Sequence, residues 1–281
     1  MATNGSFRDP VGLVRRMMAA REPAARSALV RAALEVAAKP LDGALQRRER
    51  RLVAEAPHSD QPLLFIVGPP RSGSTIVYQT IVRRLPVSYA TNLSSLFPRA
   101  PISAQELLGR RKTACRDVRS YFGQTRGLLD ANDAFHLWDR WLGSERYRAP
   151  ARIPEASVRD MRRFFDVWRS RFPAPFVNKN NRNTDCLRQL ADALPEARFV
   201  VVRRDPLATL QSLLIARRVV QGDVRIGWGL RSRDAEGDGP FAAAEAVCDQ
   251  LAEIEQRLRA DCSRVAPSRL VEVSYEQFCA A

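Results

Sequence analysis

The sequence predicts an α/β fold in which helices flank a parallel sheet, with a helical extension before it. Five short segments are predicted as strands, at about 63–67, 87–91, 176–179, 199–203 and 270–275. Helical patterns separate these segments, and two of the strands are continuous apolar runs of the kind covered on both faces. Such a sheet binds ligands outside the carboxyl ends of its strands, so we expect the functional site at that edge.

The first strand leads into a loop suited to holding an anion. The predicted strand is 63–67, LLFIV. A loop from Gly68 to Gly73 follows it, and a helix then begins at Ser74. The glycines allow the backbone to fold back and expose its N–H groups, while the helix start and nearby hydroxyl groups favour negative charge. An ordinary turn between strand and helix is the alternative.

This loop differs from that of the nucleotide triphosphatases. Their pattern requires a lysine directly after the second glycine. Here Ser74 stands at that position, and the cation of the loop is Arg71. The sequence therefore favours a phosphate-like group other than the end of a nucleoside triphosphate, with a kinase that uses ATP and magnesium as an alternative.

A second stretch, 197–217, also has phosphate-binding character. Its strand ends near Arg204, Asp205-Pro206 has the pattern of a helix start, and Ser212 follows about two helical turns later. A guanidinium group beside a helix start satisfies both the charge and the geometry of a phosphate. The alternative is that Arg204 pairs with Asp205 or with a helix end.

Together the two stretches resemble the sulfotransferases that use 3′-phosphoadenosine-5′-phosphosulfate (PAPS). Residues 70–75, PRSGST, match the loop of that family for the 5′-phosphosulfate, and Arg204 with Ser212 matches its pair for the 3′-phosphate. The resemblance spans about 63–276 and implies a P-loop fold, PAPS as donor, adenosine 3′,5′-bisphosphate as product and no metal. The donor-binding residues that it implies are Pro70, Arg71, Ser72, Gly73, Ser74, Thr75, Arg204 and Ser212.

The same resemblance implies part of the catalytic machinery. Lys179 stands at a strand end where cytosolic members carry a lysine that contacts the transferring sulfuryl group, and Arg71 is expected to stabilise charge on the leaving group. In those members a histidine two positions after the lysine is the base. Here that position is Asn181, whose amide cannot accept the proton.

The base is therefore expected elsewhere, in the patch 130–143, DANDAFHLWDRWLG. His136 and Asp133 share one helix face there. An imidazole with a free pKa of about 6.5 suits proton abstraction, so we expect His136 to be the base, with Asp133 and Glu106 as alternatives. The two tryptophans of the patch are candidates for an acceptor wall. The competing interpretation is a helix whose Trp and Leu side chains belong to the core.

The resemblance implies transfer to a hydroxyl or amine of a glycan, lipid or small-metabolite acceptor. A nucleotide-binding relative without catalysis is an alternative. The sequence does not identify the acceptor or the oligomeric state. A segment at 219–240 without clear periodicity is predicted to be a loop near the site, and it contains Trp228.

The chain is divided into a basic helical extension, 1–60, and a sulfotransferase-like domain, 61–281. Pro23 and Pro40 are expected to break the extension into two or three helices. We expect these helices to pack on the domain, with contact to an anionic membrane surface or another subunit as alternatives.

Composition limits the class of protein further. The 281 residues carry a formal net charge of +14, which attracts anions, but no nucleic-acid motif accompanies it and no nucleic-acid partner is expected. Five cysteines without a CxxC spacing argue against a disulfide framework and a zinc site and favour a reducing, cytoplasmic location. The sequence contains no apolar run of transmembrane length.

Overall fold

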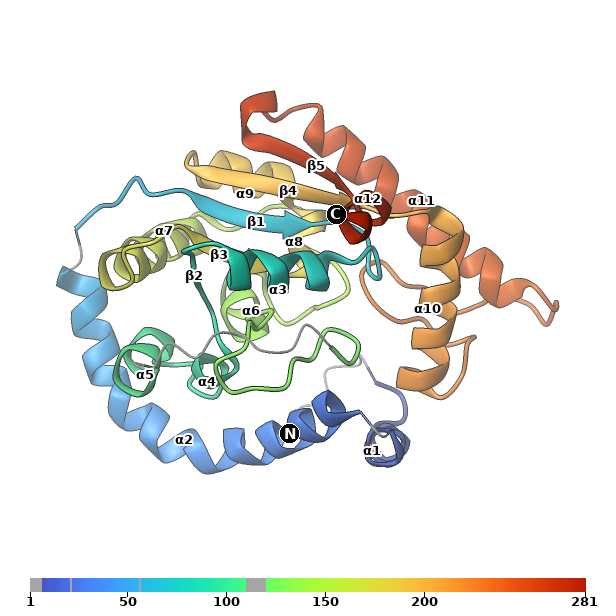
Figure 1. The fold of residues 1–281 in the computed structure, drawn as a ribbon, viewed down its shortest axis with the longest axis horizontal. Coiled ribbons are helices and arrows are strands. Elements are labelled where there is room, and N and C mark those ends of the chain that lie inside the picture. The colour runs from blue at the N-terminus through green and yellow to red at the C-terminus, as the bar shows by residue number, and fades with distance from the viewer. Residues whose placement is uncertain (1–6, 21, 56, 110–119) are drawn as a thin grey trace.

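A five-stranded parallel sheet forms the centre of the molecule (Figure 1). The computed structural model describes residues 7–20, 22–55, 57–109 and 120–281. The strand order is β2-β3-β1-β4-β5. The strands are β1 (Leu63–Val67), β2 (Ser88–Tyr89), β3 (Phe176–Lys179), β4 (Ala197–Arg203) and β5 (Leu270–Ser274). The five expected strands are confirmed, with β2 shorter than expected and β4 beginning earlier.

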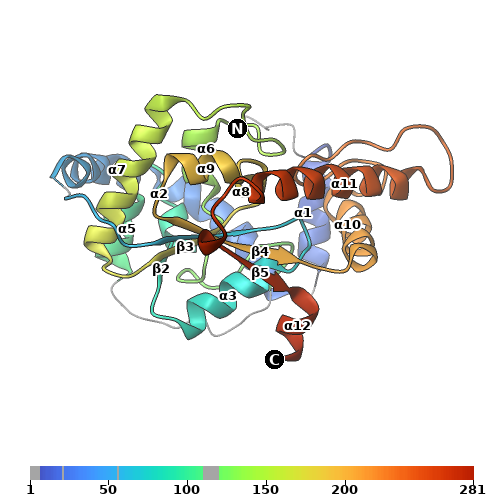
Figure 2. The same ribbon diagram turned by 90° about the horizontal axis from the view of Figure 1, so that it is seen from above.

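Helices cover both faces of the sheet, as Figure 2 shows from above. On one face lie α3 (Ser74–Arg84) and α12 (Tyr275–Ala280), and on the other α6 (Phe135–Leu142), α7 (Glu155–Arg171), α9 (Leu187–Ala193) and α11 (Ala242–Cys262). The remaining helices are α1 (Pro10–Ala19), α2 (Pro23–Glu55), α4 (Asn92–Ser95), α5 (Pro101–Leu108), α8 (Asn181–Asp185), α10 (Pro206–Gln221) and a 3₁₀ turn at Pro267–Arg269. The expected arrangement, a parallel sheet flanked by helices, is confirmed.

The apolar run of β1 serves both faces because side chains of a strand alternate in direction. Phe65 packs with Phe199, Phe165 and Trp138 on the side of α6 and α7, at ring-centroid distances from 5.6 to 6.0 Å. Ile66 belongs to the second cluster, on the side of α3. A strand with both faces covered has no polar side, which explains why the sequence shows no alternation there.

The tryptophans of the patch 130–143 belong to this core. Trp138 and Trp141 on α6 are almost fully buried, and their indole N–H groups donate to Asn178 (2.9 Å) and Asp160 (2.7 Å). They are therefore core residues, as the competing interpretation of this patch expects, and they do not form an acceptor wall.

The N-terminal helices pack on the domain. On α2, Asp42 accepts the backbone N–H of Arg99 (3.1 Å), and Glu49 accepts those of Ile102 (3.1 Å) and Ser103 (2.8 Å). Both carboxylates are buried, and they tie α2 to the segment that contains α5. Among the residues that the structure describes, none of the helices combines the length and apolar character of a membrane span.

Pro40 does not break the extension, contrary to the prediction. It lies inside α2, which runs without interruption from residue 23 to residue 55 and curves around the domain (Figure 1). Proline removes one helical hydrogen bond, but here the residue is exposed. The unpaired carbonyl of the preceding turn can be hydrated on that outer side, where curved helices lengthen their hydrogen bonds in any case.

Candidate functional site

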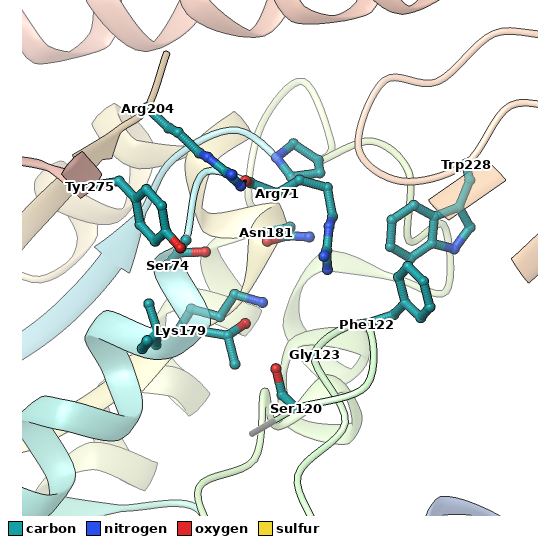
Figure 3. A pocket seen from close by; sticks show the side chains of 14 residues that line it. Arg71, Ser74, Ser120, Phe122, Gly123, Lys179, Asn181, Arg204, Trp228 and Tyr275 are labelled. Carbon is teal, nitrogen blue, oxygen red and sulfur yellow. Dashed lines mark hydrogen bonds between the residues drawn. The ribbon is translucent and has the colours of Figure 1, made fainter. Parts of the chain in front are cut away.

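A cavity of about 200 Å³ lies at the carboxyl edge of the sheet, as expected (Figure 3). It is bordered by the ends of β1, β3, β4 and β5, by the start of α3, and by two loops on the opposite side. Its lining residues are Pro70, Arg71, Gly73, Ser74, Thr75, Ile76, Ser120, Phe122, Gly123, Lys179, Asn181, Arg204, Trp228 and Tyr275.

Most of the predicted donor-binding residues meet at this cavity. Pro70, Arg71, Gly73, Ser74, Thr75 and Arg204 line it, whereas Ser72 and Ser212 do not. Among the described lining residues the charged side chains are Arg71, Lys179 and Arg204, all cations. The three come from the ends of three adjacent strands, so the sheet itself brings them together and the cavity attracts anions.

The loop after β1 is held in one conformation. The Thr184 hydroxyl accepts the N–H of Gly68 and donates to its carbonyl, both at 3.0 Å. Gly73 has φ 92°, and a Cβ there would lie 2.1 Å from the ring of Tyr275. Only glycine satisfies both the backbone angle and the close approach of that ring.

Arg71 is directed into the cavity by two contacts. Its Nε donates to the Ser212 hydroxyl at 2.9 Å, and its guanidinium lies 5.0 Å from the ring centroid of Phe122. Burial first, and then the neighbouring Arg204, lowers the pKa of Arg71 below its usual value. A bound anion would relieve both effects. Ser212 therefore reaches the site through Arg71, although it does not line the cavity.

Arg204 does not pair with Asp205, which instead accepts the Ala208 N–H at 2.8 Å and caps α10. The guanidinium of Arg204 lies 4.5 Å from the ring centroid of Tyr275, and one terminal nitrogen donates to the Arg71 carbonyl at 3.0 Å. Its Nε is buried and has no partner among the described residues. A buried guanidinium N–H without a partner is costly, so this atom is suited to bind an anionic ligand.

Lys179 and Asp133 form an ion pair at the floor of the site, with Nζ and Oδ2 2.9 Å apart. Both side chains are largely buried. Burial raises the pKa of the Asp133 carboxyl above its usual value, and Lys179 opposes that shift. A Cβ on Gly123, which lines the cavity, would lie 3.8 Å from Asp133 Oδ2. The carboxylate thus lies beside the cavity, although it is not one of the residues that line it.

The other two candidate bases lie differently. His136 is not among the residues that line the cavity, its Nε2 is buried without a partner among the described residues, and burial and then Arg146 lower its pKa to about 4. Glu106 pairs with Arg48 of the N-terminal helix α2 at 2.7 Å. Of the three, Asp133 is the one that bonds to a lining residue.

Other lining residues had weak or no signals in the sequence. Tyr275 is the last residue of the predicted strand 270–275, and nothing in the sequence marks it or Phe122 as a site residue. Phe122 lies in an irregular stretch far from the phosphate loop in sequence. Trp228 was expected near the site as part of the 219–240 loop, and it does line the cavity. In the described parts of the chain, no group of three or more His, Cys, Asp or Glu residues is arranged to hold a metal ion.

A parallel sheet flanked by helices, with its cavity at the strand ends and cations around it, defines an α/β protein that binds its ligand at the carboxyl edge. The sequence comparison makes the class specific. The family model described as "Sulfotransferase family" matches residues 62–281. The chain belongs to the sulfotransferase family.

Solved structures agree with this assignment at the level of the fold. Sulfotransferase STF1 from Mycobacterium tuberculosis H37Rv superposes with a TM-score of 0.54 at 12% identity, covering 98% of this chain and 79% of that one. Sulfotransferase STF9 from Mycobacterium avium gives 0.53 at 17% identity and covers 82% of this chain. The chain spans 62% of the length of the M. avium protein. A search of curated proteins gives no match.

Proposed function

We propose that this protein transfers the sulfuryl group of PAPS to a hydroxyl group of an acceptor. The observation that supports this most is the cluster of Arg71, Lys179 and Arg204 around one cavity, with the Arg204 Nε buried and without a partner among the described residues. A donor with separate phosphate and phosphosulfate groups fits a site whose cations come from three different strand ends. Membership of the sulfotransferase family favours this donor over ATP, which the kinase alternative requires.

The loop after β1 and the guanidinium groups divide the work of binding. The backbone N–H groups of the loop, at the start of α3, together with Arg71 would hold the 5′-phosphosulfate. Arg204, stacked on Tyr275 at the end of β4, would hold the 3′-phosphate. PAPS supplies a sulfuryl group on a good leaving group, and the cations stabilise the charge that grows on the phosphate as the bond to sulfur breaks.

Asp133 is the residue that we propose as the base. Its carboxylate would take the proton from the acceptor hydroxyl while the acceptor oxygen bonds to sulfur and the bridging oxygen leaves with adenosine 3′,5′-bisphosphate. Lys179, 2.9 Å from Asp133, lies where it can contact the sulfuryl oxygens and holds the carboxylate in place. Neither residue lines the cavity. We place the base at Asp133 and not at His136 because the Asp133 carboxylate bonds to the lining residue Lys179 and lies next to the lining residue Gly123.

Four parts of the proposal go beyond the site itself. Hydroxyl groups of glycans, lipids and small metabolites are all acceptor classes that the chemistry admits, and no metal is required. A cytoplasmic location is proposed from the cysteines, of which the four in the described residues are free: Cys186, Cys248, Cys262 and Cys279. The division of the chain at residue 60 also stays a proposal.

The donor is tested by calorimetric titration with adenosine 3′,5′-bisphosphate, compared with ADP and ATP, each with and without magnesium. We expect the bisphosphate to bind most tightly and independently of magnesium. Arg204→Ala should weaken this binding about 10- to 100-fold, because a hydrogen bond to a charged group contributes about 1.5–3 kcal/mol. Arg198→Ala is the matched control, since this arginine of β4 is exposed and, among the described residues, donates to the Ser268 carbonyl at 3.3 Å.

A preference for ATP with magnesium would contradict the proposal and favour the kinase alternative. Tight binding of the bisphosphate without turnover of PAPS by any acceptor would favour a relative that binds the nucleotide and no longer catalyses. Turnover is measured as the release of adenosine 3′,5′-bisphosphate. This product is the same for every acceptor, so the same assay serves all candidate acceptors.

A further inference from the structure

A strained turn carries Phe122 into the cavity. Tyr121 and Gln124 exchange both backbone hydrogen bonds at 2.9 Å, and the two residues between them, Phe122 and Gly123, have φ of 48° and 89°. Two-residue turns with both φ angles positive favour Asn-Gly or Gly-Gly sequences. A phenylalanine at the first position is unfavourable, so the surrounding structure must hold the turn in place.

That support comes from the N-terminal helix α2. Arg31 is 8% exposed, and its guanidinium donates to the Thr125 carbonyl and to Gln124 Oε1, both at 2.6 Å. The Thr125 hydroxyl in turn accepts from Asn92 at 2.8 Å. A buried arginine therefore fixes the end of the turn from α2, while the segment after β2 fixes it from the other side.

Phe122 forms an aromatic wall with Trp228, their ring centroids 6.2 Å apart at 84°. Both rings line the cavity. In Figure 3, Arg204 and Tyr275 lie on one side of the cavity, Phe122 and Trp228 lie on the other, and Lys179 lies between. The wall therefore lies on the side of the cavity opposite Arg204 and Tyr275, next to the Arg71 guanidinium, which is 5.0 Å from the Phe122 ring centroid.

The loop of Trp228 is also supported from the N-terminal helices. Arg16 of α1 donates to the carbonyls of Val219 (2.7 Å) and Val220 (3.0 Å) at the end of α10. Directly after them, Gln221 donates to the Gly227 carbonyl at 3.0 Å, next to Trp228. The two aromatic residues thus have separate supports, one from α2 and one from α1, and both helices lie before the segment that matches the family model.

We propose that α1 and α2 belong to the acceptor site: Arg31 positions the turn that carries Phe122, and the Phe122–Trp228 wall selects an alcohol with a flat, apolar body, such as a phenol. The proposal rests on the proposed function, which supplies the donor side. Two aromatic rings packed edge to face form an apolar surface, which binds flat apolar groups better than it binds hydrated polyols. Arg31 is a positioning residue, since it contacts the turn and not the cavity.

The test is calorimetric titration of 2-naphthol into the protein saturated with adenosine 3′,5′-bisphosphate, with glucose as the polar comparison. We expect the wild-type protein to bind 2-naphthol and not glucose. Arg31→Ala should weaken 2-naphthol binding about tenfold or more, the equivalent of about 1.4 kcal/mol, measured at a bisphosphate concentration that saturates the variant. Arg26→Ala, an exposed arginine on the same helix, is the matched control and should bind 2-naphthol as the wild type does.

Phe122→Gly guards against a variant that fails to fold, because glycine adopts a positive φ freely and should keep the turn while removing the ring. We expect this variant to lose 2-naphthol binding, measured at a bisphosphate concentration that saturates the variant, because the Phe122 ring also contacts the Arg71 guanidinium. The inference is overturned if the wild-type protein does not bind 2-naphthol. It is also overturned if Arg31→Ala and Phe122→Gly bind 2-naphthol as tightly as the wild type does. Failure of the bisphosphate to bind the wild-type protein would instead count against the proposed function.

Discussion

Asp133 is the residue whose role is tested most directly. If it is the base, Asp133→Asn should lower kcat about 10²- to 10⁴-fold for aliphatic alcohols, since this is the usual contribution of general base catalysis. The loss should be far smaller for 4-nitrophenol, which ionises without a base near neutral pH. Adenosine 3′,5′-bisphosphate should still bind. The measurement is steady-state kinetics across acceptors of different pKa.

The pH dependence gives a second readout for the same variant. The carboxylate is the active form, so wild-type activity should fall as the pH drops through the pKa of Asp133, which burial holds above its usual value. That acidic limb should be absent in Asp133→Asn. If His136→Ala lowers kcat as much as Asp133→Asn does, His136 and not Asp133 would be favoured as the base.

Single residues differ in how well the sequence predicts them. Arg71, Lys179 and Arg204 were predicted at the site, and all three line the cavity. Arg71 and Arg204 follow strongly apolar strands and Lys179 is the last residue of β3, and parallel strands bring their carboxyl ends to one edge. The pairing of Lys179 with Asp133 could not be predicted, because nothing in the sequence fixes how the loop before α6 returns to the sheet. The same holds for Phe122, whose turn lacks the usual residues.

At the scale of elements, the junction of β1 and α3 depends on the glycine in its loop. In Gly73→Ala, the positive φ destabilises the folded state by about 1–2 kcal/mol, because the new residue has a side chain. The new Cβ must also displace the Tyr275 ring. We expect reduced thermal stability and weakened binding of adenosine 3′,5′-bisphosphate, measured by thermal unfolding and calorimetry.

Gly143→Ala separates the two effects. Gly143 has φ 82°, but nothing lies within 4 Å of the position that a Cβ would take. This variant should lose at least as much stability from the backbone alone, because φ 82° with ψ 176° is a region that essentially only glycine occupies, and it should bind the bisphosphate normally. Equal binding by the two variants would mean that the contact between Gly73 and Tyr275 does not shape the site.

Elements were predicted well where burial dominates and poorly where polar contacts do. The strands and the start of α10 follow from apolar runs and from a helix cap. The short helix α4 after β2, whose capping box joins Thr91 and Ser94, is not among the elements that the sequence predicts. The continuity of α2 through Pro40 was missed because it depends on the buried contacts of Asp42 and Glu49 with a distant part of the chain.

At the scale of the whole molecule, the net charge of +14 should affect how anions reach the cavity. Binding of adenosine 3′,5′-bisphosphate should weaken several-fold as salt rises from about 0.05 to about 0.5 M, because the Debye length shrinks over that range. Uncharged adenosine, measured by the same calorimetry, should bind with an affinity that changes little. Equal salt dependence of the two ligands would show that the charge does not contribute.

The contact between Gly73 and Tyr275 also bears on when the site forms. The loop and the ring that closes over it are separated by most of the chain, and β5, which positions the ring, is the edge strand of the sheet. Contacts of such long sequence separation form late in folding, since closing a long loop costs entropy first. A growing polypeptide on the ribosome therefore has the phosphate loop early but has no finished cavity until β5 has been synthesised and has paired with β4.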